Sequence, residues 1–411
     1  MTMTSIRRAA LALGASLCAA ALALPAAAAP GNAPGGPPDH AGGPPGGGDL
    51  PPGLAKQDTL RWWAPDDLRI GTAAAGGGHH GDADYPEPFP NDPQYRDFLA
   101  DQFSSLTPEN QMKWDALRPD ADTFDFAAAD DIVAFAAEHD QHVRGHALMW
   151  HSQNPEWLEE GDFTAAELRD ILREHIHTVV GRYAGQIQQW DVVNEIVDDN
   201  AELRTEENIW IRELGTDIIA DVFHWAHEAD PEALLFFNDY NVEGTNAKSD
   251  VYYDLVQNLL ADEVPVHGFG IQGHLGLMYG FDGSLQQNME RFDDLGLQTA
   301  ITEIDVRGYV DDEGRLSPEL LDQQADWYSQ ALQACLDVSG CNSFTVWGVL
   351  DEHSWVPATF EGEGGALLLE GDFERKPAYC AAQQTLAQAN PGGHARWNNH
   401  PALAECRSML G

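Results

Sequence analysis

The chain has 411 residues, of which 43% are hydrophobic, so it is long and apolar enough to bury a full core. Its 67 acidic residues outnumber the 22 basic ones, and the formal net charge is −45 at pH 7. Such a surface repels nucleic acid and anionic membranes, so no nucleic-acid partner is expected and a neutral partner is favoured. The acidity is typical of a solvated surface or of adaptation to concentrated salt, and its spread along the whole chain favours the halophilic interpretation.

The first residues have the pattern of an export signal. Arg7 and Arg8 precede an apolar run over residues 9–24, and an alanine cluster follows. These are the basic, apolar and small-residue segments of a secretory signal peptide, so we predict that residues 1–28 are cleaved and the protein is secreted. The apolar run is shorter than a membrane span, and we expect no membrane contact after cleavage. The pattern is compatible with the Sec route and with twin-arginine export.

The remaining sequence divides into three parts by composition. Residues 29–56 are rich in Gly and Pro and cannot bury apolar surface, which predicts a disordered linker. Residues 57–390 have continuous globular composition and are predicted to form one folded domain. Residues 391–411 follow as a C-terminal tail. We expect the chain to be a monomer.

The cysteines predict two disulfides. Cys18 is lost with the signal peptide, and an even count of four in an oxidising compartment favours disulfide bonding. The short spacing favours a Cys335–Cys341 bond, which leaves Cys380 and Cys406 to attach the tail, although three pairings are formally possible. A metal site is the competing interpretation, but no CxxC motif or histidine cluster accompanies these cysteines.

Eight short apolar runs alternate with amphipathic, helix-like stretches along the predicted domain. Helix-like segments include 128–139, 164–183 and 320–336. Eight strand–helix alternations predict an α/β fold, a single (β/α)8 TIM barrel. An open, doubly wound sheet is the alternative, but no Gly-rich phosphate loop follows the first run. The runs cover residues 68–76, 103–110, 142–150, 187–195, 233–241, 267–275, 297–305 and 343–351.

Each run begins with apolar residues and ends with polar or aromatic ones. In a barrel these ends gather at the carboxyl-terminal face of the strands, where active sites lie. Glu195 ends the fourth run and Glu303 ends the seventh, so their side chains could flank one bond from opposite sides. Two carboxyl groups about 5–5.5 Å apart are what a retaining glycoside hydrolase requires. The residues at the run ends are Glu109, Asn110, His146, Trp150, Asn194, Glu195, Asp239, Tyr240, Asn241, Gln272, His274, Glu303, Asp305 and Trp347.

Six motifs resemble, in order, those of glycoside hydrolase family 10. They are TPENQMKW (107–114), RGHALMWHSQNPEW (144–157), WDVVNE (190–195), GIQGHL (270–275), ITEID (301–305) and TVWGVLDEHSW (345–355). The resemblance runs from about residue 60 to Tyr379 and so covers the whole predicted domain. That family consists largely of endo-1,4-β-xylanases. The resemblance therefore implies a catalytic domain that acts on xylan or xylo-oligosaccharides.

The resemblance also implies a role for individual residues. Glu195 would be the acid/base and Glu303 the nucleophile, with Asn194 binding the 2-hydroxyl of the sugar under attack. His274 would hold Glu303, and Asp305 would support that imidazole from behind. The residues implied to bind sugar are Glu109, Asn110, Lys113, His146 and Gln272 on the non-reducing side, Trp347 and Trp355 over the reacting sugar, and Tyr240 and Asn241 on the leaving-group side.

The residue types also fit this chemistry without the resemblance. Neutral sugars present hydroxyls and apolar faces, which suits a site that combines polar groups with flat aromatics such as Trp150. Hydrolysis by two carboxylates needs no cofactor, and none is expected, nor a metal. Two alternatives stay open: a retaining glycosidase that acts on another β-glucan, and a non-catalytic carbohydrate-binding protein. The presence of both glutamates and their orienting partners disfavours the second alternative.

Overall fold

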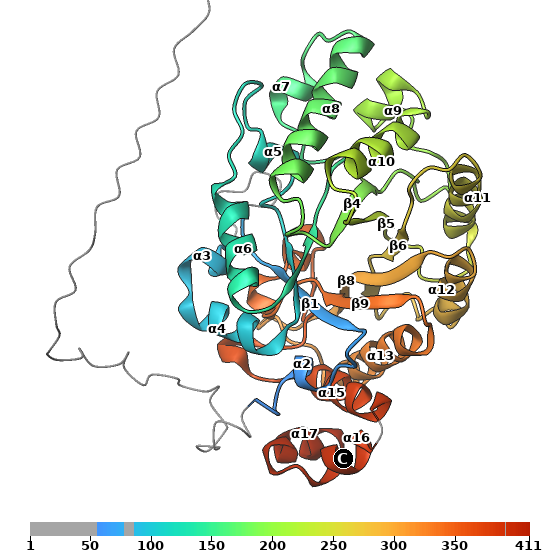
Figure 1. Cartoon of the computed structure of the whole chain (residues 1–411). Helices are drawn as coiled ribbons and strands as arrows, with labels where there is room; N and C mark the ends of the chain where they lie inside the picture. Colours follow the sequence, from blue (N-terminus) through green and yellow to red (C-terminus); the bar gives the residue numbers. More distant parts are fainter. Residues whose placement is uncertain (1–55, 78–85, 391) are drawn as a thin grey trace, which may run out of the picture. The chain divides into compact units, whose positions relative to one another are not determined.

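The computed structural model describes residues 56–77, 86–390 and 392–411. The predicted signal peptide lies outside these ranges, as does all but the last residue of the predicted linker, so both stay predictions. The described residues contain a ring of parallel strands surrounded by helices (Figure 1).

Eight strands of the described residues form a closed barrel. Neighbours pair in parallel register from β1 through β6, then β6 with β8, β8 with β9, and β9 with β1. The predicted (β/α)8 barrel is thus confirmed, and each predicted run overlaps one of its strands. The open sheet is excluded because β1 pairs on both sides. The strands are β1 (Arg69–Ala74), β2 (Ser105–Pro108), β3 (His142–Gly145), β4 (Gln189–Asn194), β5 (Leu234–Asp239), β6 (Gly268–Ile271), β8 (Gln298–Tyr309) and β9 (Cys341–Val346).

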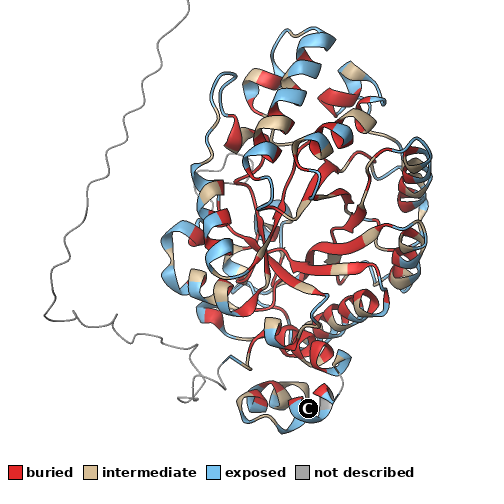
Figure 2. Cartoon of the chain, viewed as in Figure 1, coloured by how far each residue is buried: buried red, intermediate tan, exposed pale blue. Residues whose placement is uncertain are grey.

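Helices cover the outside of this barrel. They bury their apolar faces against the strands and expose the opposite faces (Figure 2). The three helix-like segments named from the sequence are helical to within two residues at each end. None of the helices in the described ranges is long and apolar enough to cross a membrane. The larger helices are α4 (Pro93–Gln102), α6 (Ala127–Glu138), α8 (Ala165–Arg182), α10 (Ile218–Ala229), α11 (Ala247–Ala261), α12 (Leu285–Asp293), α13 (Pro318–Asp337) and α15 (Pro377–Ala389).

Short helices occupy several loops, and the start of one long helix shows how the sequence sets these boundaries. Helix α8 begins after Thr164, whose side chain accepts from the backbone N–H of Glu167, while the Glu167 carboxylate accepts in return from Thr164. This reciprocal cap satisfies N–H groups that the helix itself cannot. The short helices include α2 (Leu60–Trp63), α3 (Pro88–Asn91), α5 (Trp114–Leu117), α7 (Glu156–Glu159), α9 (Ile209–Leu214) and α14 (Val356–Thr359).

Strand β8 extends beyond the apolar run that predicted it. The run ends at Asp305, whereas the strand continues to Tyr309. Its outer half is stabilised by two additional short strands, β7 (His274–Gly276) in parallel and β10 (Glu363–Gly364) in antiparallel register. Both partners come from distant parts of the sequence, which explains why hydrophobic periodicity alone does not show the extension.

The first segment of the described domain lies at the amino-terminal end of the barrel strands. The Arg61 guanidinium in α2 donates to the carbonyls of Ala100 (2.9 Å) and His139 (3.3 Å), at the ends of α4 and α6. Asp58 forms an ion pair with Arg375 at 2.9 Å, immediately before α15. The first segment of this domain therefore lies on the face opposite the carboxyl-terminal strand ends, and it also contacts the segment that precedes α15.

Two disulfides lie at the carboxyl-terminal side of the chain. Cys335 at the end of α13 is bonded to Cys341 at the start of β9, and Cys380 in α15 is bonded to Cys406 in α17 (Ala404–Leu410). The predicted pairing is confirmed, and none of these four thiols is left for a metal. The predicted tail contains two short helices, α16 (Gly393–Asn399) and α17, which pack against α15.

Candidate active site

The polar residues that end the predicted runs gather at one end of the barrel. Glu195 follows β4, and Glu303 lies within β8 on the other side of the ring. Both carboxylates are largely enclosed, with side chains 13% and 5% exposed. A buried carboxylate needs hydrogen-bond donors to stay ionised, so the surroundings of each one indicate what it can do.

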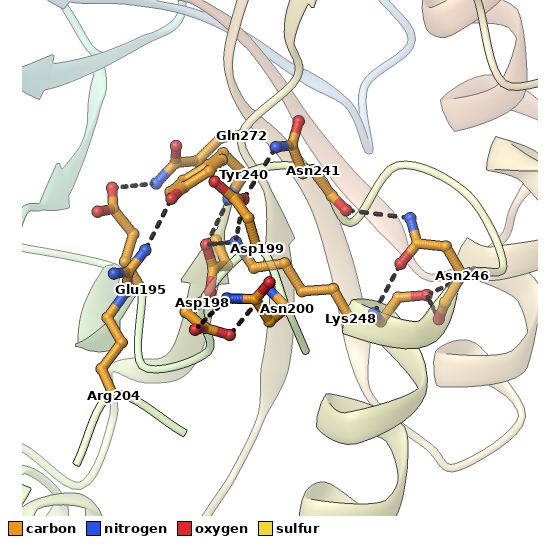
Figure 3. A network of polar contacts seen from close by, with 12 residues as sticks. Glu195, Asp198, Asp199, Asn200, Arg204, Tyr240, Asn241, Asn246, Lys248 and Gln272 are labelled. Atoms are coloured by element: carbon orange, nitrogen blue, oxygen red, sulfur yellow. Dashed lines mark hydrogen bonds and ion pairs between the residues drawn. The ribbon is translucent and has the colours of Figure 1, made fainter. Parts of the chain in front are cut away.

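Glu195 accepts two side-chain hydrogen bonds. Trp150 Nε1 donates to one oxygen at 2.7 Å. Gln272 Nε2 donates to the other at 2.9 Å, as Figure 3 shows. Burial raises the pKa of Glu195, but the nearby His151 imidazole and these two donors outweigh burial, so the pKa lies below its usual value. The backbone of Glu195 is in the left-handed region, with φ of 53°. Such a turn directs a side chain away from the strand path and is uncommon for a residue with a Cβ.

Glu303 is held by an amide and an imidazole. Asn238 Nδ2 donates to one of its oxygens at 2.7 Å, and His274 Nε2 lies 3.3 Å from the other. His274 Nδ1 lies 2.8 Å from Asp305, which also accepts from Trp355 Nε1 at 2.8 Å. Burial lowers the pKa of His274, but the two carboxylates outweigh burial and raise it to about 10. His274 is therefore an imidazolium at neutral pH, and this positive charge lies beside the Glu303 carboxylate.

Asn194 and Asn238 connect the two carboxylates through the barrel. Asn238 Nδ2 also donates to Asn194 Oδ1 at 2.9 Å, while Thr302 Oγ1 donates to Asn238 Oδ1 at 2.6 Å. These contacts fix both amides in one orientation. Asn194 Nδ2 is then left buried without a partner in the described part of the chain. A buried unpaired N–H is costly, so this group suits a ligand oxygen.

His146 belongs to a second buried charge network. Its Nδ1 lies 2.9 Å from Asp191 Oδ2, and Asp191 is also paired with the Arg144 guanidinium. Burial raises the pKa of Asp191, but Arg144 and His146 outweigh burial and hold it below its usual value. His146, Asp191 and Glu303 are the one group in the described ranges whose atoms lie close enough to ligate a metal, within 4.8 Å of one another. Their oxygens are already paired with Arg144 and Asn238, so the arrangement fits a hydrogen-bond network better than a metal centre.

A compact polar cluster lies on the β2 and β3 side of the site. Lys113 Nζ donates to Asn110 Oδ1 at 3.0 Å and to Gln153 Oε1 at 2.8 Å, and it lies 4.9 Å from the centre of the Trp150 ring. Burial lowers the pKa of Lys113, although Glu109 and both candidate catalytic carboxylates oppose this. The Glu109 carboxylate accepts from the backbone N–H of Gly76 at 3.1 Å. Three of the five residues predicted for the non-reducing side thus lie in one cluster, while His146 contacts Asp191 and Gln272 contacts Glu195.

The residues predicted for the leaving-group side lie on the loop after β5. Tyr240 OH accepts from Arg204 at 2.7 Å, and Asn241 Nδ2 donates to Asp199 at 3.2 Å (Figure 3). Next to them is a cavity of about 370 Å³, whose lining includes Asn241 and His274. Pockets of this order hold small ligands. The site is therefore open on the β5, β6 and β8 side, next to the residue that holds Glu303.

The two predicted tryptophans enclose His274. The Trp347 ring centre lies 6.3 Å from that of His274 and 5.4 Å from that of His146. The Trp355 ring centre lies 4.9 Å from that of His274. The residues predicted for sugar binding and catalysis therefore lie around one centre, and none of them lies in a distant part of the fold.

Four further contacts of this site were missed in the sequence. Asn238 and Asp191 are polar residues inside otherwise apolar strands, and this interruption was a usable signal. Gln153 and Arg204 come from loops, where polar residues are ordinary and no pattern distinguishes them. Their role depends on loop conformations that only the folded structure shows.

A (β/α)8 barrel whose carboxyl-terminal face carries two enclosed carboxylates, amides and aromatic rings defines a glycoside hydrolase. The family model of glycosyl hydrolase family 10 matches residues 69–385. The chain belongs to this family, which confirms the resemblance seen in the motifs, and it is an enzyme.

Individual relatives agree with this assignment. Over 302 residues the chain is 40% identical to endo-1,4-beta-xylanase B of Thermotoga neapolitana, covering 73% of this chain and 85% of that protein. Over 304 residues it is 39% identical to endo-1,4-beta-xylanase 1 of Humicola insolens, covering 72% and 69%. The structure of xylanase 10B from Thermotoga maritima matches with a TM-score of 0.74 and 38% identity, over 80% of this chain and 98% of that one. Xylanase 10B from Thermotoga petrophila in complex with xylobiose matches with a TM-score of 0.73.

Proposed function

We propose that this protein is a secreted, retaining endo-1,4-β-xylanase that hydrolyses internal β-1,4-xylosidic bonds of xylan by double displacement. The relatives named above carry this activity in their names, and retention is characteristic of the family. The observation that carries the proposal is the contrast between the two carboxylates. Glu195 accepts hydrogen bonds from the neutral Trp150 and Gln272 side chains, with His151 Nδ1 3.9 Å away, whereas Glu303 is in direct contact with an amide and an imidazolium.

This contrast supports a division of roles. A nucleophile attacks as an anion, and the Glu303 carboxylate lies 3.3 Å from the His274 imidazolium. In the first step Glu303 would attack the anomeric carbon while Glu195 gives its proton to the departing oxygen. In the second step Glu195 would take a proton from water, which attacks the glycosyl-enzyme and releases the sugar with retained configuration.

The remaining residues fit the binding of neutral sugars. The unpaired Asn194 Nδ2 suits the 2-hydroxyl of the reacting sugar, where hydrogen bonds strengthen in the transition state. We assign Glu109, Asn110, Lys113, His146, Trp150 and Gln272 to the non-reducing side, Trp347 and Trp355 to the reacting sugar, and Tyr240 and Asn241 to the leaving group. Xylan and xylo-oligosaccharides would be the substrates, because an acidic surface does not oppose a neutral polymer.

Three features of the proposal rest on the sequence alone. The N-terminal pattern supports export by the Sec or twin-arginine route, the overall charge supports function in concentrated salt, and a single catalytic domain supports a monomer that does not contact the membrane. We also retain residues 57–390 as the proposed extent of that domain.

The substrate class is tested by reducing-sugar release from xylan, cellulose and mixed-linkage glucan. Release from xylan in excess of the other two is the expected outcome. Equal or greater release from a glucan would favour the second enzyme hypothesis, and binding without release would favour a carbohydrate-binding protein.

The roles of the glutamates are tested by azide rescue on an aryl xyloside with a good leaving group. Glu195→Ala should form the covalent intermediate and then stall, because no base activates water. Azide needs no base, so it should restore turnover of Glu195→Ala and give a β-configured azide. Glu303→Ala should lose activity on every substrate, and azide should give the α-product after a single inversion. A β-azide from Glu303→Ala, or an inverted sugar from the wild type, would refute these roles.

A further inference from the structure

Lys248 is a buried cation beneath the aromatic ring that we assign to the leaving group. It is one of only four lysines in the chain, lies in the first turn of α11, and is 5% exposed. Its Nζ lies 3.6 Å from the centre of the Tyr240 ring and donates to Asp239 Oδ1 at 2.8 Å. Burying an ammonium is costly even when it is paired, so its presence here calls for a specific role.

The surroundings of Tyr240 indicate what this role is. Its hydroxyl accepts from Arg204 at 2.7 Å (Figure 3). Its backbone N–H donates to Asp239 at 2.8 Å. Lys248 covers one face of the ring, so the exposed part of Tyr240 belongs to the opposite face and the edge. A sugar ring stacks on the open face of an aromatic side chain, and any rotation of Tyr240 would remove that surface.

The same ion pair also contacts the turn that carries Glu195. Asp239 Oδ2 accepts from the hydroxyl of Tyr252, and that hydroxyl accepts from the backbone N–H of Ile196 at 3.1 Å. Ile196 follows Glu195, whose backbone is in the left-handed region. An uncommon backbone conformation persists only where its neighbours hold it.

We propose that Lys248 is a positioning residue for the proposed reaction. Its ammonium holds the Tyr240 ring against the leaving-group sugar and, through Asp239 and Tyr252, supports the turn of Glu195. This inference rests on the proposed function, because it assigns Lys248 to the half of the site that the leaving-group sugar occupies. Lys248 touches neither the nucleophile nor the sugar under attack, so its loss should affect substrates according to their leaving group.

The test compares two substrates that share the non-reducing part and differ in what leaves. Xylotetraose places sugars against Tyr240, whereas β-xylobiosyl fluoride releases a single atom that needs neither Tyr240 nor a proton from Glu195. Lys248→Met should lower kcat/KM for xylotetraose about tenfold, because a desolvated cation–π contact is lost. The value for the fluoride should change by less than about twofold, since the glycosyl-enzyme forms without leaving-group assistance.

A second buried lysine supplies the matched control. Lys376 is 2% exposed and pairs with Asp351 at 2.9 Å, and it contacts neither Tyr240 nor Glu195. Lys376→Met should lower the thermal midpoint, as Lys248→Met does, while the ratio of the two kcat/KM values stays at the wild-type value. A substrate-dependent change in Lys248→Met alone would support the inference.

Two outcomes would overturn it. If kcat/KM of Lys248→Met falls equally for both substrates, Lys248 has only a structural role. If kcat/KM for xylotetraose is unchanged, Lys248 does not affect the site. If Lys248→Met does not fold, the double variant with Asp239→Asn leaves no unpaired buried charge and must show the same split. A wild type that cleaves neither substrate would refute the proposed function itself, whereas a normal wild type with no split refutes only the role of Lys248.

Discussion

His175 offers a direct test of how burial controls stability in this fold. It lies in α8, is fully buried, and stacks on Trp114 with ring centres 3.6 Å apart and 12° between the planes. Phe124 stacks near it, at 5.9 Å. Neither ring nitrogen of His175 has a hydrogen-bond partner within the described ranges. An imidazole in such a position can be accommodated only in its neutral form.

This environment makes stability depend on pH in a defined direction. Burial, together with Arg118, lowers the pKa of His175 well below its usual value of 6.5. Below pH 6.5 the unfolded chain binds a proton that the folded chain does not, so the stability from neutral burial is present above pH 6.5 and is lost as pH falls. The loss is about 1.4 kcal/mol per pH unit, or about 2 kcal/mol between pH 6.5 and 5.

His175→Phe isolates this contribution. The free energy of unfolding of both proteins is measured with denaturant at pH 7, 6 and 5. Phe is larger than His, so a constant offset between the two proteins is expected from packing. The other histidines are common to both proteins and cancel in the difference, which should move in favour of His175→Phe by about 2 kcal/mol from pH 7 to pH 5. A difference that stays constant with pH would refute the reasoning.

Three further predictions concern other parts of the molecule. The mature chain would lose Arg7 and Arg8 and no acidic residue, so its formal net charge changes from −45 to −47. Its thermal midpoint should rise with potassium chloride up to molar concentration, because the Debye length falls to about 3 Å there and the repulsion between acidic residues is screened. A midpoint that stays flat or falls would contradict salt adaptation. The Cys380→Ser/Cys406→Ser variant opens a link of sequence separation 26 and should lose about 3.5 kcal/mol in denaturant unfolding, whereas a loss near zero would show that the tail helices contribute little. Gln272→Met removes a hydrogen-bond donor to the ionised Glu195 carboxylate and should raise the pKa of Glu195. The alkaline limb of the pH profile of kcat/KM should therefore move to higher pH. If the limb does not move, Glu195 does not determine its position.

The sequence predicted the barrel because each strand carries a complete local signal. The run 233–241, for example, is apolar through Phe237 and then becomes polar, and this switch marks both the strand and the end that faces the site. The enclosed positions of Glu195 and Glu303 follow from that pattern and from the eightfold repeat. The two disulfides were predictable because one short spacing left only one partner for the other pair.

What the sequence did not show depends on contacts between distant segments. Strand β8 is longer than its apolar run because β7 and β10 pair with its outer half. The orientation of Asn238 depends on Thr302, which is 64 positions away in sequence. Likewise, His175 is an ordinary helix residue until Trp114 is placed against its ring. None of these relationships has a periodic signature, because each arises only when the barrel closes.

The positions of the first and last segments of the described domain have a practical consequence for any attached partner. Asp58 and Arg61 are bound at the amino-terminal strand ends, and α17 is held to α15 by the Cys380–Cys406 bond. A polypeptide fused before residue 57 would therefore leave the domain near the amino-terminal strand ends, away from the two glutamates, whereas one fused after the last helix would leave it beside α15. An enzyme immobilised through its amino-terminal side could thus present its open cleft to a solid polymer.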